Sequence, residues 1–139
     1  MTVIDATDLI LGRMAANVAK RAMLGETISV VNCEKIVISG SRRDIFTRYR
    51  ERLAKGSQAN GPFYPRKADA IVRRSIRGMI PYKQGKGKLA LARVQVFIGV
   101  PENLAKEKLE TIKEANVSRL GRAKHTVLSE IAIYLGGKL

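Results

Sequence analysis

The feature of this sequence that most constrains its fold is the alternation of short apolar segments with segments of helical periodicity. Residues 2–6 and 28–32 are short and rich in branched side chains, which is typical of β-strands. Between them, residues 12–24 place apolar side chains at helical spacing, and Gly25 follows as a typical helix terminator. This alternation continues along the chain and predicts an α/β domain with a mostly parallel sheet.

Two further strands are predicted at residues 36–39 and 94–98, since each is a short run rich in branched side chains. The first of them raises a difficulty. Only about three residues separate it from the strand at 28–32, whereas a parallel pair needs a crossover of a dozen residues or more. Either the connection is a single compressed turn, or these two strands are not direct neighbours in the sheet.

Further helices are predicted from periodicity and from terminating residues. They cover residues 41–55, 68–79 and about 128–135, with a charged helical stretch of uncertain extent at about 103–109. Ser41 can cap the first of these helices, and Asp44 completes a pair similar to a capping box. The helix at 68–79 is expected to bury Met79, and Pro81 to end it.

The segments between these helices are expected to be loops. Residues 56–65 are dense in Gly and Pro, which is typical of a loop. Residues 83–88 read Lys-Gln-Gly-Lys-Gly-Lys and are expected to form a flexible cationic loop, whose glycines would let it follow a groove.

Charge is the unusual property of this chain. It has 26 Lys and Arg against 12 Asp and Glu, a formal net charge of +14. Residues 42–93 hold fifteen of these cations and only three anions, whereas residues 1–41 hold four of each. Such charges repel one another in the isolated fold, and a polyanion would relieve the repulsion. Nucleic acid is the commonest polyanionic partner, and the alternative is a basic surface that serves only solubility.

The basic helices and the loop at 83–88 supply the candidate binding residues. Arg presents a planar fork that pairs with phosphate in a bidentate manner, and Lys adds a mobile point charge. Arg73 and Arg77 lie one turn apart, so they share a helix face. The predicted RNA-binding residues are Arg42, Arg43, Arg48, Arg66, Lys67, Arg73, Arg74, Arg77, Lys83, Lys86 and Lys88.

Aromatic residues are few, with no Trp, three Phe and four Tyr, so base stacking is not expected to dominate. Phe63, Tyr64 and Tyr82 flank the basic segment. Each of them could stack on a base or pack under the loop, and the sequence leaves both roles open.

Nucleotide-binding and catalytic functions are poorly supported. Residues 85–88 superficially resemble a phosphate loop, but the GxxxxGK pattern followed by Ser or Thr is missing, and Gly12 stands without a GxGxxG set. His125 is the only histidine, so neither a His-based metal site nor a pair of imidazole groups is available. Cys33 is expected to be a buried thiol. The sequence predicts no enzyme, no cofactor, no metal and no small-molecule substrate.

The chain as a whole is expected to form a single domain over residues 1–139, which is an ordinary domain size. One cysteine excludes an internal disulfide, and no run approaches the roughly 20 apolar residues of a membrane span. The N-terminal residues show no secretory signal. A cytoplasmic protein without a membrane partner is therefore expected.

Three segments resemble the universal ribosomal protein L-thirteen family of the large subunit. They are residues 4–40, with the Leu-Gly-Arg turn; residues 73–101, with the run Arg77-Gly78-Met79-Ile80-Pro81; and residues 61–74, which are similar to the archaeal and eukaryotic branch. The long basic C-terminal extension of eukaryotic members is absent, so an archaeal-type member is the best fit.

This resemblance implies a three-layer α/β/α fold around a four-stranded, mostly parallel central sheet. It also implies a non-enzymatic structural protein that binds large-subunit rRNA, supports subunit assembly and has neighbouring ribosomal proteins as partners. The family's RNA-contacting positions map best onto Arg77, Lys83, Lys86 and Lys88. A nucleotide-using enzyme and a DNA-binding or chaperone-like module are the rival hypotheses.

Overall fold

The sheet at the centre of the computed structural model has four parallel strands in the order β4-β2-β1-β5. The structure describes residues 1–121 and 123–139. Strand β1 pairs with β2 from Thr2 opposite Ile28 to Asp5 opposite Val31. The strands are β1 (Thr2–Asp5), β2 (Ile28–Val31), β4 (Val94–Val96) and β5 (Leu109–Glu110). The predicted four-stranded parallel sheet is confirmed.

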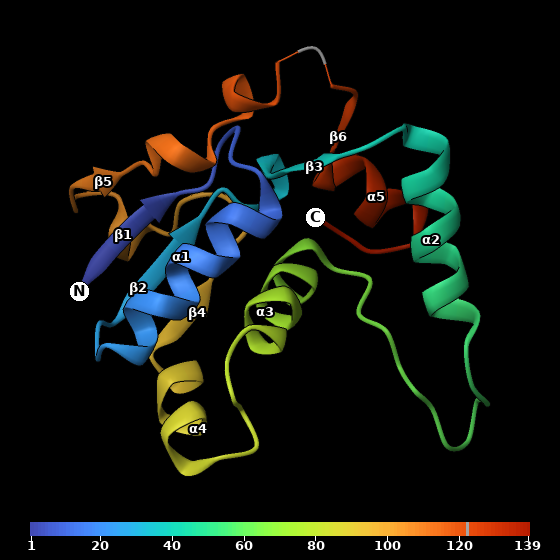
Figure 1. The fold of residues 1–139 in the computed structure, drawn as a ribbon, viewed down its shortest axis with the longest axis horizontal. Helices are drawn as coiled ribbons and strands as arrows, with labels where there is room; N and C mark the ends of the chain where they lie inside the picture. Colours follow the sequence, from blue (N-terminus) through green and yellow to red (C-terminus); the bar gives the residue numbers. More distant parts are fainter. Residues whose placement is uncertain (122) are drawn as a thin grey trace.

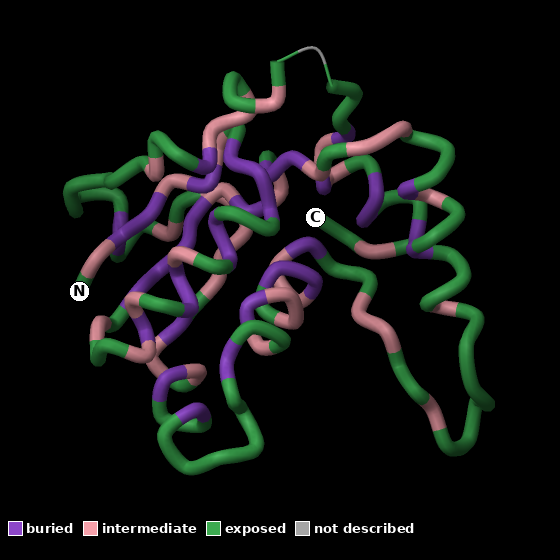
Figure 2. The backbone as a smooth tube through the Cα atoms, viewed as in Figure 1, coloured by how far each residue is buried: buried purple, intermediate pink, exposed green. Residues whose placement is uncertain are grey.

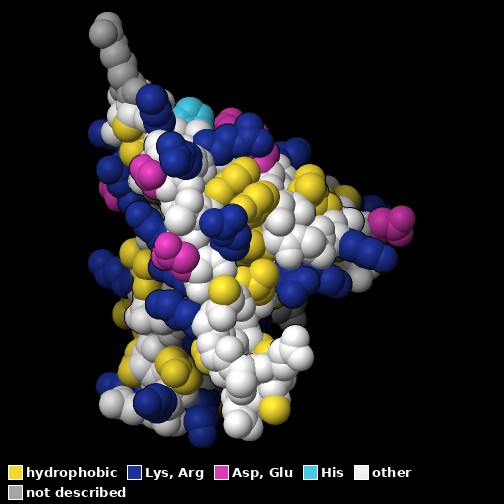
Figure 3. Space-filling model, turned by 90° about the vertical axis from the view of Figure 1, so that its right-hand side faces the viewer, with side chains coloured by type: hydrophobic (Ala, Val, Ile, Leu, Met, Phe, Trp, Pro, Cys, Tyr) yellow, Lys and Arg dark blue, Asp and Glu magenta, His cyan; other side chains and the backbone are white. Residues whose placement is uncertain are grey.

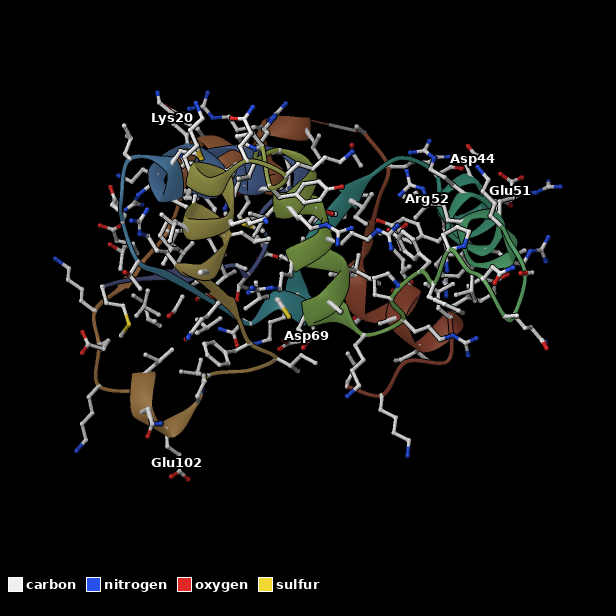
Figure 4. All side chains as sticks on the ribbon, turned by 90° about the horizontal axis from the view of Figure 1, so that it is seen from below. Lys20, Asp44, Glu51, Arg52, Asp69 and Glu102 are labelled. Carbon is white, nitrogen blue, oxygen red and sulfur yellow. The ribbon has the colours of Figure 1, made fainter. Side chains whose placement is uncertain are left out.

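The two faces of this sheet are covered unequally. Helices α1 (Leu11–Met23), α3 (Ala68–Gly78) and α4 (Gly85–Ala92) lie on one face, whereas a 3₁₀ turn at Glu102–Leu104 lies on the other (Figure 1). Figure 4 shows this layering from below, with Lys20 of α1 and Glu102 on opposite sides of the sheet. The expected three-layer α/β/α architecture is confirmed, although the second helical layer is thin.

Alternating strand residues explain the two layers. Ile4 and Val30 belong to the large core beneath the helices. Their neighbours Val3 and Val31 belong to a small separate cluster with Leu104, against which Phe97 packs. The main core therefore lies between the sheet and the helices, and it holds α1 and α3 in fixed positions.

Strand β3 (Val37–Ser39) does not join this sheet. It pairs antiparallel with β6 (His125–Val127), a strand that was not predicted. Asn32 adopts a left-handed conformation with φ of 55°, and a 3₁₀ turn at Cys33–Lys35 then redirects the chain. Of the two alternatives for the closely spaced strands, the second is correct: β2 and β3 are not neighbours.

The fourth place in the main sheet belongs to β5, in a region where a helix was expected. The prediction of a helix at about 103–109 is wrong, because only residues 102–104 are helical and residues 109–110 pair with β1. Both residues of β5 are exposed. A strand this short and this exposed carries no alternating apolar pattern, so the sequence gives no sign of it.

Helix α2 (Arg42–Ala54) lies to one side of the sheet and packs with α5 (Leu128–Tyr134) and β6 (Figures 1 and 2). The Ser41 hydroxyl accepts a hydrogen bond from the Asp44 amide at 3.2 Å, so the predicted cap is confirmed. Ile45 and Tyr49 are buried, and the Phe46 ring stacks on Tyr134 with centroids 4.5 Å apart. These contacts place α2 across from α3.

The prediction of a flexible loop at residues 83–88 is wrong, because α4 begins at Gly85. Gly87 is buried, and a Cβ on it would overlap the carbonyl group of Pro81. This glycine permits a close approach of two backbone segments and does not supply flexibility. Met79 is 47% exposed and Ile80 is buried, so the expected burial of Met79 is also wrong.

Candidate nucleic-acid interface

The cations of residues 42–93 are almost without acidic partners. Within the described residues, the one ion pair of this segment joins Arg42 to Glu130 at 3.4 Å, and both side chains are exposed to solvent. An exposed pair of this kind neutralises little. Figure 3 shows Lys and Arg side chains spread along a whole face of the molecule, with few Asp and Glu among them. The fold therefore displays its excess charge and does not pair it internally.

The three arginines of α3 have different surroundings. The Arg73 guanidinium donates to the carbonyl oxygens of Val94 and, at 3.4 Å, of Leu91, so it ties α3 to the junction of α4 and β4. The Arg77 guanidinium lies 5.1 Å from the centroid of the Tyr82 ring. Arg73 and Arg77 still line one cavity of about 360 Å³, together with Arg74. The predicted shared face is confirmed, but Arg73 already holds protein carbonyls.

The predicted loop lysines form a cationic corner at the start of α4. Lys83 lies in the turn before the helix, Lys86 and Lys88 lie in its first turn, and all three are exposed. We call these three residues the α4 corner. Cations at a helix N-terminus oppose the helix dipole, and Gln84 provides no side-chain cap there. An anion at this position would be stabilised by both the lysines and the free amides.

A groove separates α2 from α3. Two cavities of about 400 and 360 Å³ share Arg52 and Ser75, so they are adjacent parts of this groove. We call it the α2–α3 groove. Its first part is lined by residues that include Arg13, Arg48, Tyr49, Arg52 and Met79, and its second by Lys55, Tyr64 and Arg74. No carboxylate of the described residues lines either part.

Tyr64 organises the cations of the second part of the groove. The guanidinium of Arg74 lies 4.6 Å from the Tyr64 ring centroid and that of Arg52 lies 5.9 Å from it. Arg52 also donates to the Tyr64 hydroxyl at 3.5 Å, and Arg74 donates to the Phe63 carbonyl at 3.1 Å. Arginines from two different helices are thus held around one aromatic ring. No acidic residue among those that line this part of the groove neutralises their mutual repulsion.

Tyr49 of α2 is buried and lines the first part of the α2–α3 groove. Its ring meets Tyr64 edge to face with centroids 5.9 Å apart. Burial, with a further contribution from Tyr64, raises the pKa of Tyr49 to about 12, although Arg52 and Arg48 act in the opposite direction. The phenol is therefore neutral at physiological pH and does not pair as an anion with the arginines beside it.

The predicted binding residues lie in several groups on α2, α3 and α4, and Arg74 belongs to two of them. Arg48 and Arg74 lie in the α2–α3 groove, and Arg73, Arg74 and Arg77 share a cavity on α3. Arg42 and Arg43 lie at the start of α2, with the Arg42 guanidinium 5.1 Å from the Phe46 ring centroid. Arg66 and Lys67 are exposed just before α3, and Lys83, Lys86 and Lys88 form the α4 corner.

Sequence reasoning missed three cations that line the groove: Arg13, Arg52 and Lys55. Arg52 and Lys55 belong to a helix already recognised as basic, so a helical projection that placed Arg48 and Arg52 on one face would have found Arg52. Arg13 comes from the electrically neutral first third of the chain. No signal in the sequence points to it, because the fold alone brings the start of α1 to the groove.

Other kinds of site have little support in the structure. The described residues contain no group of three or more His, Cys, Asp or Glu side chains that could hold a metal ion. Cys33 is buried, as expected, and burial, with Glu34 and Asp69 adding to it, raises the pKa of its thiol to about 12. Within the described residues, no helix has both the length and the apolar character needed to span a bilayer.

Comparisons with known proteins agree on one family. The model of the family described as Ribosomal protein L13 matches residues 1–103. A Methanosarcina barkeri protein named Large ribosomal subunit protein uL13 is 45% identical over 139 residues, and the alignment covers 99% of each chain. Proteins of the same name from Archaeoglobus fulgidus and Methanocaldococcus jannaschii are 43% and 44% identical. Those alignments cover 97% and 99% of this chain, and 87% and 99% of the relatives.

Proposed function

Because the chain belongs to the ribosomal protein L13 family, we propose that it is a structural constituent of the large ribosomal subunit that binds rRNA through a basic face. Its archaeal relatives are named as proteins of that subunit. The role is structural and not enzymatic, and its place is the ribosome in the cytoplasm. Its partners are large-subunit rRNA and neighbouring ribosomal proteins, and it supports assembly of the subunit.

The observation that carries the rRNA-binding part of the proposal is the uncompensated charge of residues 42–93. This segment has fifteen cations and three anions, and within the described residues it forms one ion pair. Phosphates that bind these cations release condensed counterions, which favours association. Folded RNA presents phosphate arrays with a definite shape, so a rigid display of cations gives specificity without base reading.

The α4 corner and Arg77 are the centre of the proposed interface. The three lysines are exposed and have no acidic neighbour among the ion pairs of the described residues. Arg42, Arg43, Arg48, Arg66, Lys67 and Arg74 extend the contact along α2 and α3. Arg73 has a double role, because its guanidinium also fixes α3 to the α4–β4 junction.

Assembly of large subunits in cells tests this proposal. The variant with Arg77→Ala and Lys83, Lys86 and Lys88 each changed to Gln is expected to keep its circular dichroism spectrum but to enter large subunits poorly. Chemical footprinting of the rRNA with and without the protein then locates the contact. A matched control changes Lys106, Lys108, Lys113 and Lys138 to Gln, which removes the same charge outside residues 42–93. Equal incorporation of the two variants would contradict the assignment.

The rival functions make different predictions. A nucleotide-using enzyme places its phosphate loop between a strand and a helix, whereas the turn before α4 follows helix α3. A general DNA-binding or chaperone-like module would bind duplex DNA as tightly as folded rRNA. In direct competition, the proposed function predicts that the rRNA fragment displaces duplex DNA at equal phosphate concentration.

A further inference from the structure

The α2–α3 groove continues beyond the two cavities described above. A third cavity, of about 610 Å³, shares Lys55, Pro62 and Tyr64 with the second part of the groove. The three cavities together form one path from the start of α1, between α2 and α3, to the loop at residues 56–66. A path of this form suits an extended chain better than a compact ligand.

The lining of this path is cationic throughout. Arg13, Arg48 and Arg52 line its first part, Lys55 and Arg74 its second, and Arg66 its third. Figure 4 shows Arg52 on the side of α2 that faces α3, whereas Asp44 and Glu51 lie on other sides of this helix. The groove therefore excludes the acidic residues of α2 and is complementary to a polyanion.

An exposed aromatic ring stands at one end of the path. Phe63 is 72% exposed although it is large and apolar, and it lines the third cavity next to Tyr64. Exposed aromatic rings beside a cationic groove are the arrangement by which proteins bind single-stranded nucleic acid. The phosphates follow the cations, and bases stack on the rings. Among the described residues, no other aromatic ring stacks on Phe63.

We propose that the α2–α3 groove holds an unpaired segment of RNA, with phosphates against Arg48, Arg52 and Arg74 and a base stacked on Phe63. This inference rests on the proposed rRNA-binding function and names the kind of RNA that one part of the protein takes. A paired segment fits less well, because an RNA duplex hides the faces of its bases and leaves Phe63 nothing to stack on. An acidic peptide would match the charges but not the ring.

A tryptophan placed at the ring position reports stacking directly. The chain has no Trp, so Phe63→Trp gives a single tryptophan in the full-length protein, and its fluorescence can be excited selectively over that of tyrosine. A short single-stranded oligoadenylate is expected to quench this fluorescence in a saturable manner. An RNA duplex at equal phosphate concentration is expected to quench it little. Leu24→Trp, at an exposed position just after α1 and outside the groove lining, is the control and is expected to respond to neither.

The cations are tested by Arg52→Gln with Arg74→Gln. Loss of two phosphate contacts should weaken oligoadenylate binding roughly tenfold. It should also make the salt dependence less steep, so that the slope of log K against log salt concentration becomes smaller in magnitude by about 1.4. The control is Arg50→Gln with Lys106→Gln, which removes the same charge from exposed positions outside the groove. Thermal unfolding of both variants verifies that the fold is kept.

Three results would overturn the inference: equal weakening by the groove and control variants, equal quenching by duplex RNA, or quenching by polyglutamate as strong as by oligoadenylate. Failure of the groove assignment and failure of the proposed rRNA-binding function give different results. If the groove variant binds oligoadenylate like the wild type but the protein still binds an rRNA fragment in a salt-dependent manner, only the groove assignment is lost. If no RNA binds in that manner, the proposed function itself is lost.

Discussion

Single residues set the positions of the strand ends and turns around which the interface is built. Asp5, at the end of β1, accepts hydrogen bonds from the Thr7 amide at 3.0 Å, the Thr7 hydroxyl at 2.7 Å and the Asn32 side chain at 3.0 Å. This carboxylate therefore joins the ends of β1 and β2. Partial burial opposes its ionisation, but the hydrogen bonds and the nearby Lys35 outweigh burial and lower the pKa of Asp5.

The lowered pKa of Asp5 predicts a loss of stability in acid. The unfolded chain titrates this carboxyl near pH 3.9, at about its reference value. Ionised Asp5 therefore stabilises the fold above that pH, and the contribution is lost as the pH falls through the lower pKa of the folded state. Urea unfolding across the acid range should show a shallower pH dependence for Asp5→Asn than for the wild type. Parallel pH curves for the two proteins would contradict this assignment.

Gly87 and Gly85 provide a matched pair of residues in α4. A Cβ at position 87 would overlap the Pro81 carbonyl, whereas a Cβ at position 85 would meet nothing within 4 Å. Gly87→Ala should lower the free energy of unfolding by about 1–3 kcal/mol through overpacking. Gly85→Ala should leave it unchanged or raise it by about 0.4–1 kcal/mol, because Ala restricts the unfolded chain. Urea denaturation measures both, and equal losses would show that close approach is not the reason for Gly87.

Among the elements, those with a strong apolar period or clear end signals were predicted well, and those with neither were not. Helices α1, α2 and α3 and strands β1 and β2 lie within a residue or two of their predicted bounds. Helix α4 was missed because Gly and Lys occupy its first turn, and only the packing of Gly87 against Pro81 shows why a glycine lies at position 87. Strand β6 was missed because its partner β3 was assigned to the wrong sheet.

Helix α2 is the element on which one wall of the α2–α3 groove depends, and its start is fixed by Ser41. The Ser41 hydroxyl accepts from the Asp44 amide and donates to the Asp44 carboxylate at 2.6 Å. Ser41→Ala should lower the free energy of unfolding by about 1 kcal/mol, as the loss of an N-cap does. Thr47→Ala, at an exposed position within α2, is the control and should be neutral or slightly stabilising. A smaller loss for Ser41→Ala than for Thr47→Ala would contradict the capping role.

At the scale of the whole molecule, the central strands of the sheet and the excess positive charge come from different parts of the chain. Residues 1–41 are neutral and supply β1, α1 and β2, whereas residues 42–93 carry most of the excess charge on α2, α3 and α4. The sequence predicted this division and the fold class. It could not predict the α2–α3 groove, because only packing between distant elements brings Arg13 and Arg74 to its two adjacent parts. The net charge of a segment can be read from the sequence, whereas the residues that line a groove are known only from the fold.

The central claim is that uncompensated cations bind the backbone of rRNA, and the salt dependence of binding tests it most directly. The measurement is the affinity of the full-length protein for a large-subunit rRNA fragment between about 50 and 200 mM salt. If six or more phosphates are bound, affinity should fall by about a thousandfold or more across this range. An affinity that stays the same from the lower to the higher salt concentration would contradict the account.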